Sequence, residues 1–230
     1  MLAQTQVARV LTVWPQFIAE FPDVETAALA GPGALIAAWG RLGYPRRARR
    51  LWEAAAHVHE HGWPDDYAAL PGVGRYTAGA LAAQADERAD AIGVDVNIRR
   101  VVQRVCGHVL PARAAEDAAV EIARGIEGRD RLLALMDLGA MVCRPRAPLC
   151  DECPLRTRCA TRGELAGEQS RRQPPYRGSM RERRGTVLAR LRDTPHPGVR
   201  ANELDADALA SLVADGLACV ARGRVTLPRR

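Results

Sequence analysis

Four cysteines gather in a stretch of seventeen residues, and their thiols are the side chains of this chain best suited to hold a metal. They are Cys143, Cys150, Cys153 and Cys159, separated by six, two and five residues. Thiolates this close on one short loop can surround a single ion or a compact cluster, and tetrahedral zinc accepts four sulfurs as well. Zinc sites usually have two paired Cys-x2-Cys knuckles, whereas this run has one pair with unequal arms. The spacing therefore favours an iron-sulfur cluster over zinc.

A glycine-rich turn in residues 70–80, Leu-Pro-Gly-Val-Gly-Arg-Tyr-Thr-Ala-Gly-Ala, is the second candidate. Gly72, Val73 and Gly74 form a tight turn that leads directly into a helix. Glycines let a ligand approach the backbone, and amides at a helix N-terminus can hold a phosphate without reading base sequence. Ordinary helix capping explains most such turns. Beside a basic chain and the cysteine run, we interpret this one as a helix-hairpin-helix DNA clamp.

The charge of the chain indicates a polyanionic partner. Its formal net charge is +6 and its pI is about 9.4, which favours nucleic acid over a merely basic surface. All 33 basic residues are arginine. Without a lysine, a mechanism that needs a Schiff base is excluded unless the N-terminal amine takes part.

No run approaches the roughly eighteen apolar residues of a membrane span, and the first residues lack the pattern of a signal peptide. We therefore expect a soluble, cytoplasmic protein without a membrane partner. Cys106 and Cys219 stand alone, so the six cysteines are no disulfide framework, and these two are interpreted as buried small hydrophobic residues or inert thiols.

Short helices joined by tight turns are expected up to about residue 159. Apolar residues recur every three or four positions in residues 27–39, 47–61 and 75–85, with Gly and Pro at their ends. Aromatic residues make up only 4% of the chain and β-branched runs are scarce before residue 180, which argues against a sandwich or barrel. The fold class predicted is mostly α.

A second, smaller module is expected near the C-terminus. Residues 205–217 have the pattern of an amphipathic helix, and residues 218–227 alternate like a hairpin around Gly223. This order resembles part of a winged helix. A mere accessory packing element is the alternative.

Several of these motifs together resemble the endonuclease III superfamily, and within it the MutY-type adenine glycosylases. The likeness covers about residues 1–160. The segments that carry it are the hairpin, the cysteine run and residues 1–7, 39–44, 94–101 and 136–143.

The resemblance implies a helix-hairpin-helix glycosylase fold in four parts. Residues 1–94 would form a six-helix domain, shortened at its N-terminus, and residues 95–160 would carry one 4Fe-4S cluster. Residues 161–180 are polar and proline-bearing, as expected of a linker. Residues 181–230 would form the small α/β, winged-helix-like module.

The resemblance also implies an activity, the monofunctional removal of adenine mispaired with 8-oxoguanine or guanine. Such an enzyme binds double-stranded DNA as a monomer at the nucleoid and flips the base out of the helix. Asp95 matches the carboxylate that stabilises positive charge on the sugar, and Asn97 would orient it. A helix N-cap is the plainer role of Asp95, compatible with catalysis. Tyr76 occupies the position of the lysine in relatives that also cut the strand.

The remaining expected contacts are with DNA. Gln4 and Tyr44 match positions that intercalate, and Thr5 and Leu42 match contacts with the opposing base. Each is alternatively an ordinary helix-surface or core residue. The glycines of the hairpin, with Val73 and Tyr76, would hold the backbone and line the base pocket.

One catalytic group of the family has no counterpart here. The family's general acid is a glutamate two residues before the position of Met1, so the chain as written is expected to be catalytically impaired. A start site assigned too late explains this, and a fragment or a catalytically impaired, mismatch-binding paralogue is the alternative.

Overall fold

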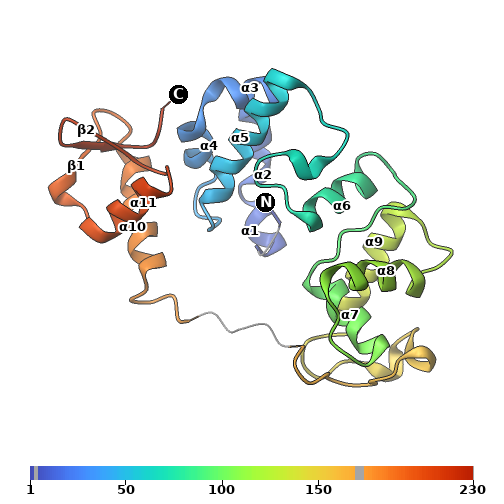
Figure 1. The fold of residues 1–230 in the computed structure, drawn as a ribbon. Helices are drawn as coiled ribbons and strands as arrows, with labels where there is room; N and C mark the ends of the chain where they lie inside the picture. Colours follow the sequence, from blue (N-terminus) through green and yellow to red (C-terminus); the bar gives the residue numbers. More distant parts are fainter. Residues whose placement is uncertain (3–4, 169–173, 230) are drawn as a thin grey trace. The chain divides into compact units, whose positions relative to one another are not determined.

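The computed structural model describes residues 1–2, 5–168 and 174–229 and is mostly helical, with one three-stranded sheet (Figure 1). The mostly α fold class is thereby confirmed. The chain divides into two compact units: the first comprises Met1–Pro64, Leu70–Gly72 and Gln173–Arg230, and the second Asp65–Ala69 and Val73–Arg172. Among the described residues, none of the helices combines the length and apolar character needed to cross a bilayer.

Five helices make up the N-terminal part of the first unit. The expected helix over residues 27–39 is in fact two helices, because Gly31 has a φ of 83° and Pro32 follows it. Asp23 begins the earlier one by accepting a hydrogen bond from the Thr26 amide at 2.7 Å. The five helices are α1 (Val7–Leu11), α2 (Trp14–Glu20), α3 (Val24–Ala30), α4 (Pro32–Ala38) and α5 (Arg46–His61).

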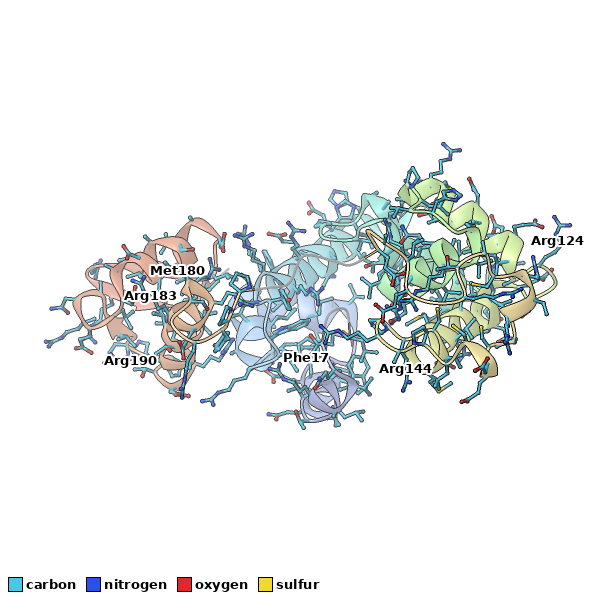
Figure 2. The ribbon with its side chains drawn as sticks, turned by 90° about the horizontal axis from the view of Figure 1, so that it is seen from below. Phe17, Arg124, Arg144, Met180, Arg183 and Arg190 are labelled. Carbon is cyan, nitrogen blue, oxygen red and sulfur yellow. The ribbon has the colours of Figure 1, made fainter. Side chains whose placement is uncertain are left out.

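The C-terminal part of the first unit contains the amphipathic helix and the hairpin expected from the sequence, preceded by a further helix and a short strand. Strand β1 pairs with β3, and β3 with β2, all antiparallel. Arg183 and Arg190 extend from the helix that opens this module (Figure 2). Its elements are α10 (Met180–Asp193), β1 (Val199–Arg200), the 3₁₀ turn η5 (Ala201–Glu203), α11 (Ala206–Ala214), β2 (Cys219–Ala221) and β3 (Arg224–Thr226).

One hydrophobic core joins the C-terminal module to the N-terminal helices. Trp39 and Leu42 belong to the same buried cluster as Leu191, Leu212 and Val225. The contact is close enough that a Cβ on Gly33 would lie 2.3 Å from the Pro228 carbonyl oxygen. The module is therefore part of the first unit.

The second unit packs four helices around a core that includes Ile98, Val102 and Leu132. After α9 the chain forms a π-helical segment, η2 (Leu138–Val142), directly before the first cysteine of the run. The other elements are η1 (Tyr67–Ala69), α6 (Arg75–Gln84), α7 (Val96–Cys106), α8 (Ala112–Ile122), α9 (Gly128–Asp137), η3 (Cys150–Glu152) and η4 (Arg156–Arg158).

Compact units and functional domains need not coincide. The units join residues at the two ends of the chain, whereas the division expected from the sequence was sequential, at residues 94, 160 and 180. That functional division stays a prediction.

Candidate functional site

Asp95 caps the N-terminus of α7 with its carboxylate. Its Oδ1 accepts hydrogen bonds from the amides of Asn97 at 2.9 Å and Ile98 at 2.7 Å. Its Oδ2 accepts one from Asn97 Nδ2 at 3.0 Å. These bonds to the N-terminus of α7 fix the orientation of the half-buried carboxylate. The N-cap role that the sequence suggested for Asp95 is thus present.

Asn97 is held in turn by Arg100, one helical turn further along α7. The guanidinium donates Nη2–H to Asn97 Oδ1 at 2.9 Å and to the Gly139 carbonyl at 2.6 Å. Its Nε–H donates to the Cys143 carbonyl at 2.7 Å. A continuous hydrogen-bonded chain therefore runs from the Asp95 carboxylate to the backbone of the first cysteine.

Three close backbone contacts bring the Asp95 loop against its neighbours. A Cβ on Gly79 in α6 would lie 2.1 Å from the Ile92 carbonyl oxygen, and one on Gly93 would lie 2.5 Å from that of Tyr76. On the other side, a Cβ on Gly139 would meet Asn97 at 2.8 Å. The glycines are thus needed for Asp95 and Asn97 to lie between α6 and the π-helical segment.

Tyr76, in the first turn of α6, is close enough to Asp95 to be affected by its charge. Burial, and the nearby negative charge of Asp95, raise the pKa of its hydroxyl above the ordinary value. The hydroxyl therefore stays protonated at neutral pH. The charge of Asp95 acts on Tyr76, and Asn97 is hydrogen-bonded to Asp95, so we group these three residues of the second unit as one candidate site.

The glycine turn before α6 has the backbone expected of a hairpin. Gly72 has a φ of 76°, and Gly74 is the N-cap of α6 without a side-chain cap hydrogen bond. The first amides of α6 thus keep donor capacity for an anion. In the first unit, the stem of Arg50 occupies the space that a Cβ on Gly72 would take, at 2.6 Å. That this turn binds DNA stays a prediction.

The four clustered cysteines line one small pocket in the second unit, with a cavity volume of about 20 Å³. Val142, Pro148 and Leu149 supply apolar walls, while Arg104, Arg156 and Arg162 supply positive charge. Within the described residues, no three His, Cys, Asp or Glu side chains are gathered about one ion position. The thiols are distributed around the pocket wall. Arg144 lies in the loop between the first two of them (Figure 2).

Arg104 is a buried residue of α7 that bonds to the segment carrying the four cysteines, residues 143–159, which we call the cysteine loop. Its side chain is 1% exposed and pairs with Glu168, which is 4% exposed, with Nε donating to Oε2 at 2.8 Å. The guanidinium also donates to the Arg144 carbonyl at 2.8 Å and to Cys143 Sγ at 3.5 Å. Backbone bonds from Ala160 and Thr161 to carbonyls of α7 complete the attachment. The segment that contains the four cysteines is therefore held against α7 by side-chain and backbone hydrogen bonds.

The remaining predicted DNA contacts fall in the first unit or outside the described residues. Tyr44 is 40% exposed on the turn before α5, whereas Leu42 is 3% exposed and belongs to the core. Thr5 is half-buried before α1, and Gln4 lies outside the described residues. For Leu42 the structure shows a packing role, and its contact with an opposing base stays a prediction.

The sequence analysis did not single out Arg100, Arg104 or Glu168. The sequence did contain a signal for Arg100 and Arg104, because both lie among the apolar residues of α7. An arginine buried there needs charged or carbonyl partners, so a polar contact could have been expected. Nothing marked Glu168, which lies in the stretch expected to be a linker.

A glycine hairpin that leads into a helix, beside a carboxylate that caps the next helix, is the arrangement of a helix-hairpin-helix DNA glycosylase, and the comparisons agree with it. Residues 1–122 match the family model "HhH-GPD superfamily base excision DNA repair protein". The chain is 39% identical to an adenine DNA glycosylase of Mycolicibacterium smegmatis, over 94% of this chain and 80% of that protein.

Two solved structures share the fold. A thermostable thymine-DNA glycosylase has a TM-score of 0.61 at 27% identity, covering 70% of this chain and 79% of its own. A trapped endonuclease III–DNA covalent intermediate has a TM-score of 0.62 at 24% identity, with coverage of 70% and 79%.

The chain therefore belongs to the HhH-GPD superfamily of base excision DNA repair proteins, and within it to the MutY-type glycosylases. It is a DNA-binding hydrolase that cleaves N-glycosidic bonds. The resemblance inferred from the motifs is confirmed.

Removing the buried partner of Arg104 tests how the cysteine loop is held. Glu168→Ala leaves an uncompensated buried charge, so we expect the second unit to lose about 3 kcal/mol or more of stability in urea denaturation followed by circular dichroism. Asp117→Ala, at an exposed position of α8 in the same unit, should cost less than about 1 kcal/mol. Equal effects of the two substitutions would contradict a stabilising role for the buried pair.

Proposed function

We propose that this DNA glycosylase removes adenine mispaired with 8-oxoguanine or guanine, as a monofunctional enzyme. The observation that carries the proposal is the fixed carboxylate of Asp95 beside Tyr76. The relatives named adenine DNA glycosylases support adenine as the base. We further propose that the protein acts as a monomer on chromosomal DNA.

Asp95 would act through charge. As the bond between the base and the sugar breaks, positive charge develops on the sugar, and a carboxylate already oriented beneath it needs no reorganisation to stabilise that charge. The bonds from Asn97 and the α7 amides hold this orientation. Water supplies the hydroxyl that joins the sugar, and adenine leaves with a proton.

Tyr76 would line the pocket for the flipped base. It stands where relatives that cut the strand have a lysine, and a protonated phenol does not form a Schiff base. The expected product is therefore an intact strand with an abasic site. The turn with Tyr44 would fill the gap left by the flipped base.

Single-turnover excision from a duplex with one adenine·8-oxoguanine pair tests the activity. Asp95→Asn keeps the shape of the side chain and most of its hydrogen bonds but removes its charge, so we expect excision to slow by about 10²-fold or more. Asp90→Asn is the matched control, because Asp90 is exposed and pairs only with nearby Arg88. It should leave the rate within about twofold.

The same assay separates the enzyme from a non-catalytic mismatch binder. It should be run on this chain and on a version extended upstream in frame. Tight, salt-sensitive binding with no adenine release from either version would contradict the proposed activity and favour the binder.

We further infer that Cys143, Cys150, Cys153 and Cys159 hold one 4Fe-4S cluster. In such a cluster each thiolate binds a different iron, so the thiols must be spread around a cavity, as they are around this pocket. Arg104 already donates to Cys143 Sγ at 3.5 Å, and this contact would help to offset the negative charge of that sulfur as a ligand. When bound, the cluster would keep the basic loop in position to contact the DNA backbone.

Metal content tests this inference directly. Purified under anaerobic conditions, the protein should be brown and contain about four irons and four acid-labile sulfides per chain. Cys153→Ser should abolish the visible absorbance, while Cys106→Ser, outside the run, should retain it. A colourless protein with one zinc per chain would contradict the inference.

A further inference from the structure

The N-terminus of α5 carries an unbalanced positive charge. Four of its first five residues are arginine, its first turn has no acidic residue, and Pro45 provides no side-chain cap. A helix N-terminus already has a partial positive charge, so arginines there destabilise it. Within α5, Glu53 pairs with Arg49 one turn further on, and the remaining arginines need negative charge from other elements of the first unit.

Asp215 in the C-terminal module supplies that charge. It lies at the C-terminal end of α11, and its side chain is 13% exposed. Its Oδ1 pairs with Arg46 Nη2 at 2.5 Å, and its other carboxylate oxygen pairs with Arg184. Its backbone carbonyl accepts a hydrogen bond from Arg49 Nη1 at 2.5 Å. The negative end of α11 thus holds two arginines of α5.

Gly216 leaves space for the guanidinium of Arg49. Its φ is 64°, and a Cβ there would lie 2.0 Å from Arg49 Nη1. The guanidinium therefore occupies the space that a side chain would fill. Arg49 Nε also pairs with Glu53 at 2.9 Å, so the Arg49 guanidinium is held both by α5 and by the Asp215 carbonyl.

The start of α5 fixes one end of the turn that carries Tyr44. Tyr44 has a φ of 48°, an unfavourable backbone for a tyrosine, and its ring lies 5.0 Å from the Arg47 guanidinium. On the other side, buried Trp39 donates its indole N–H to the Gly43 carbonyl at 2.9 Å. Such a backbone persists only where its surroundings enforce it, so both ends of the turn must be held.

We propose that Asp215 is a positioning residue for DNA intercalation: by neutralising the first turn of α5, it holds Tyr44 in the exposed position from which the ring enters the duplex. This inference rests on the proposed function, since it takes Tyr44 as the wedge. Burial acts to raise the pKa of Asp215, but hydrogen bonds from Arg46 and Arg184 outweigh it and lower the pKa. The carboxylate is thus charged at neutral pH.

The test is a double-mutant cycle between Asp215→Asn and Tyr44→Ala. The probe is a duplex with 2-aminopurine beside an adenine·8-oxoguanine pair, because unstacking raises its fluorescence. We expect Asp215→Asn to weaken binding about tenfold and to reduce the fluorescence rise. In the Tyr44→Ala background the same substitution should change the affinity less than about twofold.

Two further variants separate positioning from folding. Asp215→Glu retains the charge and should restore most of the affinity and fluorescence. Glu203→Gln, at an exposed carboxylate of the same module that pairs with Arg190, should leave both readouts unchanged. If Asp215→Asn weakens binding equally with and without Tyr44, Asp215 serves only the stability of the unit and the proposal is overturned.

Neither readout needs base excision. A non-additive cycle supports the positioning role even if no adenine is released, in which case only the proposed activity fails. Additive effects alongside normal excision would overturn the positioning role alone.

Discussion

The cap of α7 by Asp95 is the interaction on which the second unit depends. The same carboxylate starts the helix and lies at the candidate site, so the geometry that caps the helix is also the one that the proposed catalysis requires. Because the cap bonds involve Asn97, and Asn97 is held by Arg100, the carboxylate cannot turn without disturbing the backbone near Cys143. The cysteine loop is thus mechanically connected to the site without being part of it.

In the first unit, the exposed aromatic side chain of Tyr44 lies on a turn with an unfavourable backbone conformation. Tyr44 lies between a buried tryptophan and an arginine-rich helix start, and neither alone determines its position. The C-terminal module shares the core of this unit and brings a carboxylate to the helix start. The sequence suggested a winged-helix-like module here, with an accessory packing element as the alternative, and the structure shows that the module packs into the core of the first unit.

Features encoded locally were predictable from the sequence. The cysteine spacing, the glycine turn and the hairpin around Gly223 depend on neighbouring residues, and the Asp95 cap depends on residues two and three positions away. The pairs Arg104–Glu168 and Arg46–Asp215 were not predictable, because they join ordinary residue types far apart in the chain. Leu42 illustrates the same limit. Its family position suggests a DNA contact, but only the packing around it reveals a core residue.

The central claim is that Asp95 stabilises positive charge on the sugar, and a charged mimic of that state measures this without requiring turnover. Two duplexes should be compared, one with a cationic pyrrolidine in place of the adenosine sugar and one with a neutral tetrahydrofuran. The account predicts that the protein binds the cationic duplex at least about 10²-fold more tightly and that Asp95→Asn removes this preference. Equal affinity for the two duplexes, or a preference that survives the substitution, would contradict it.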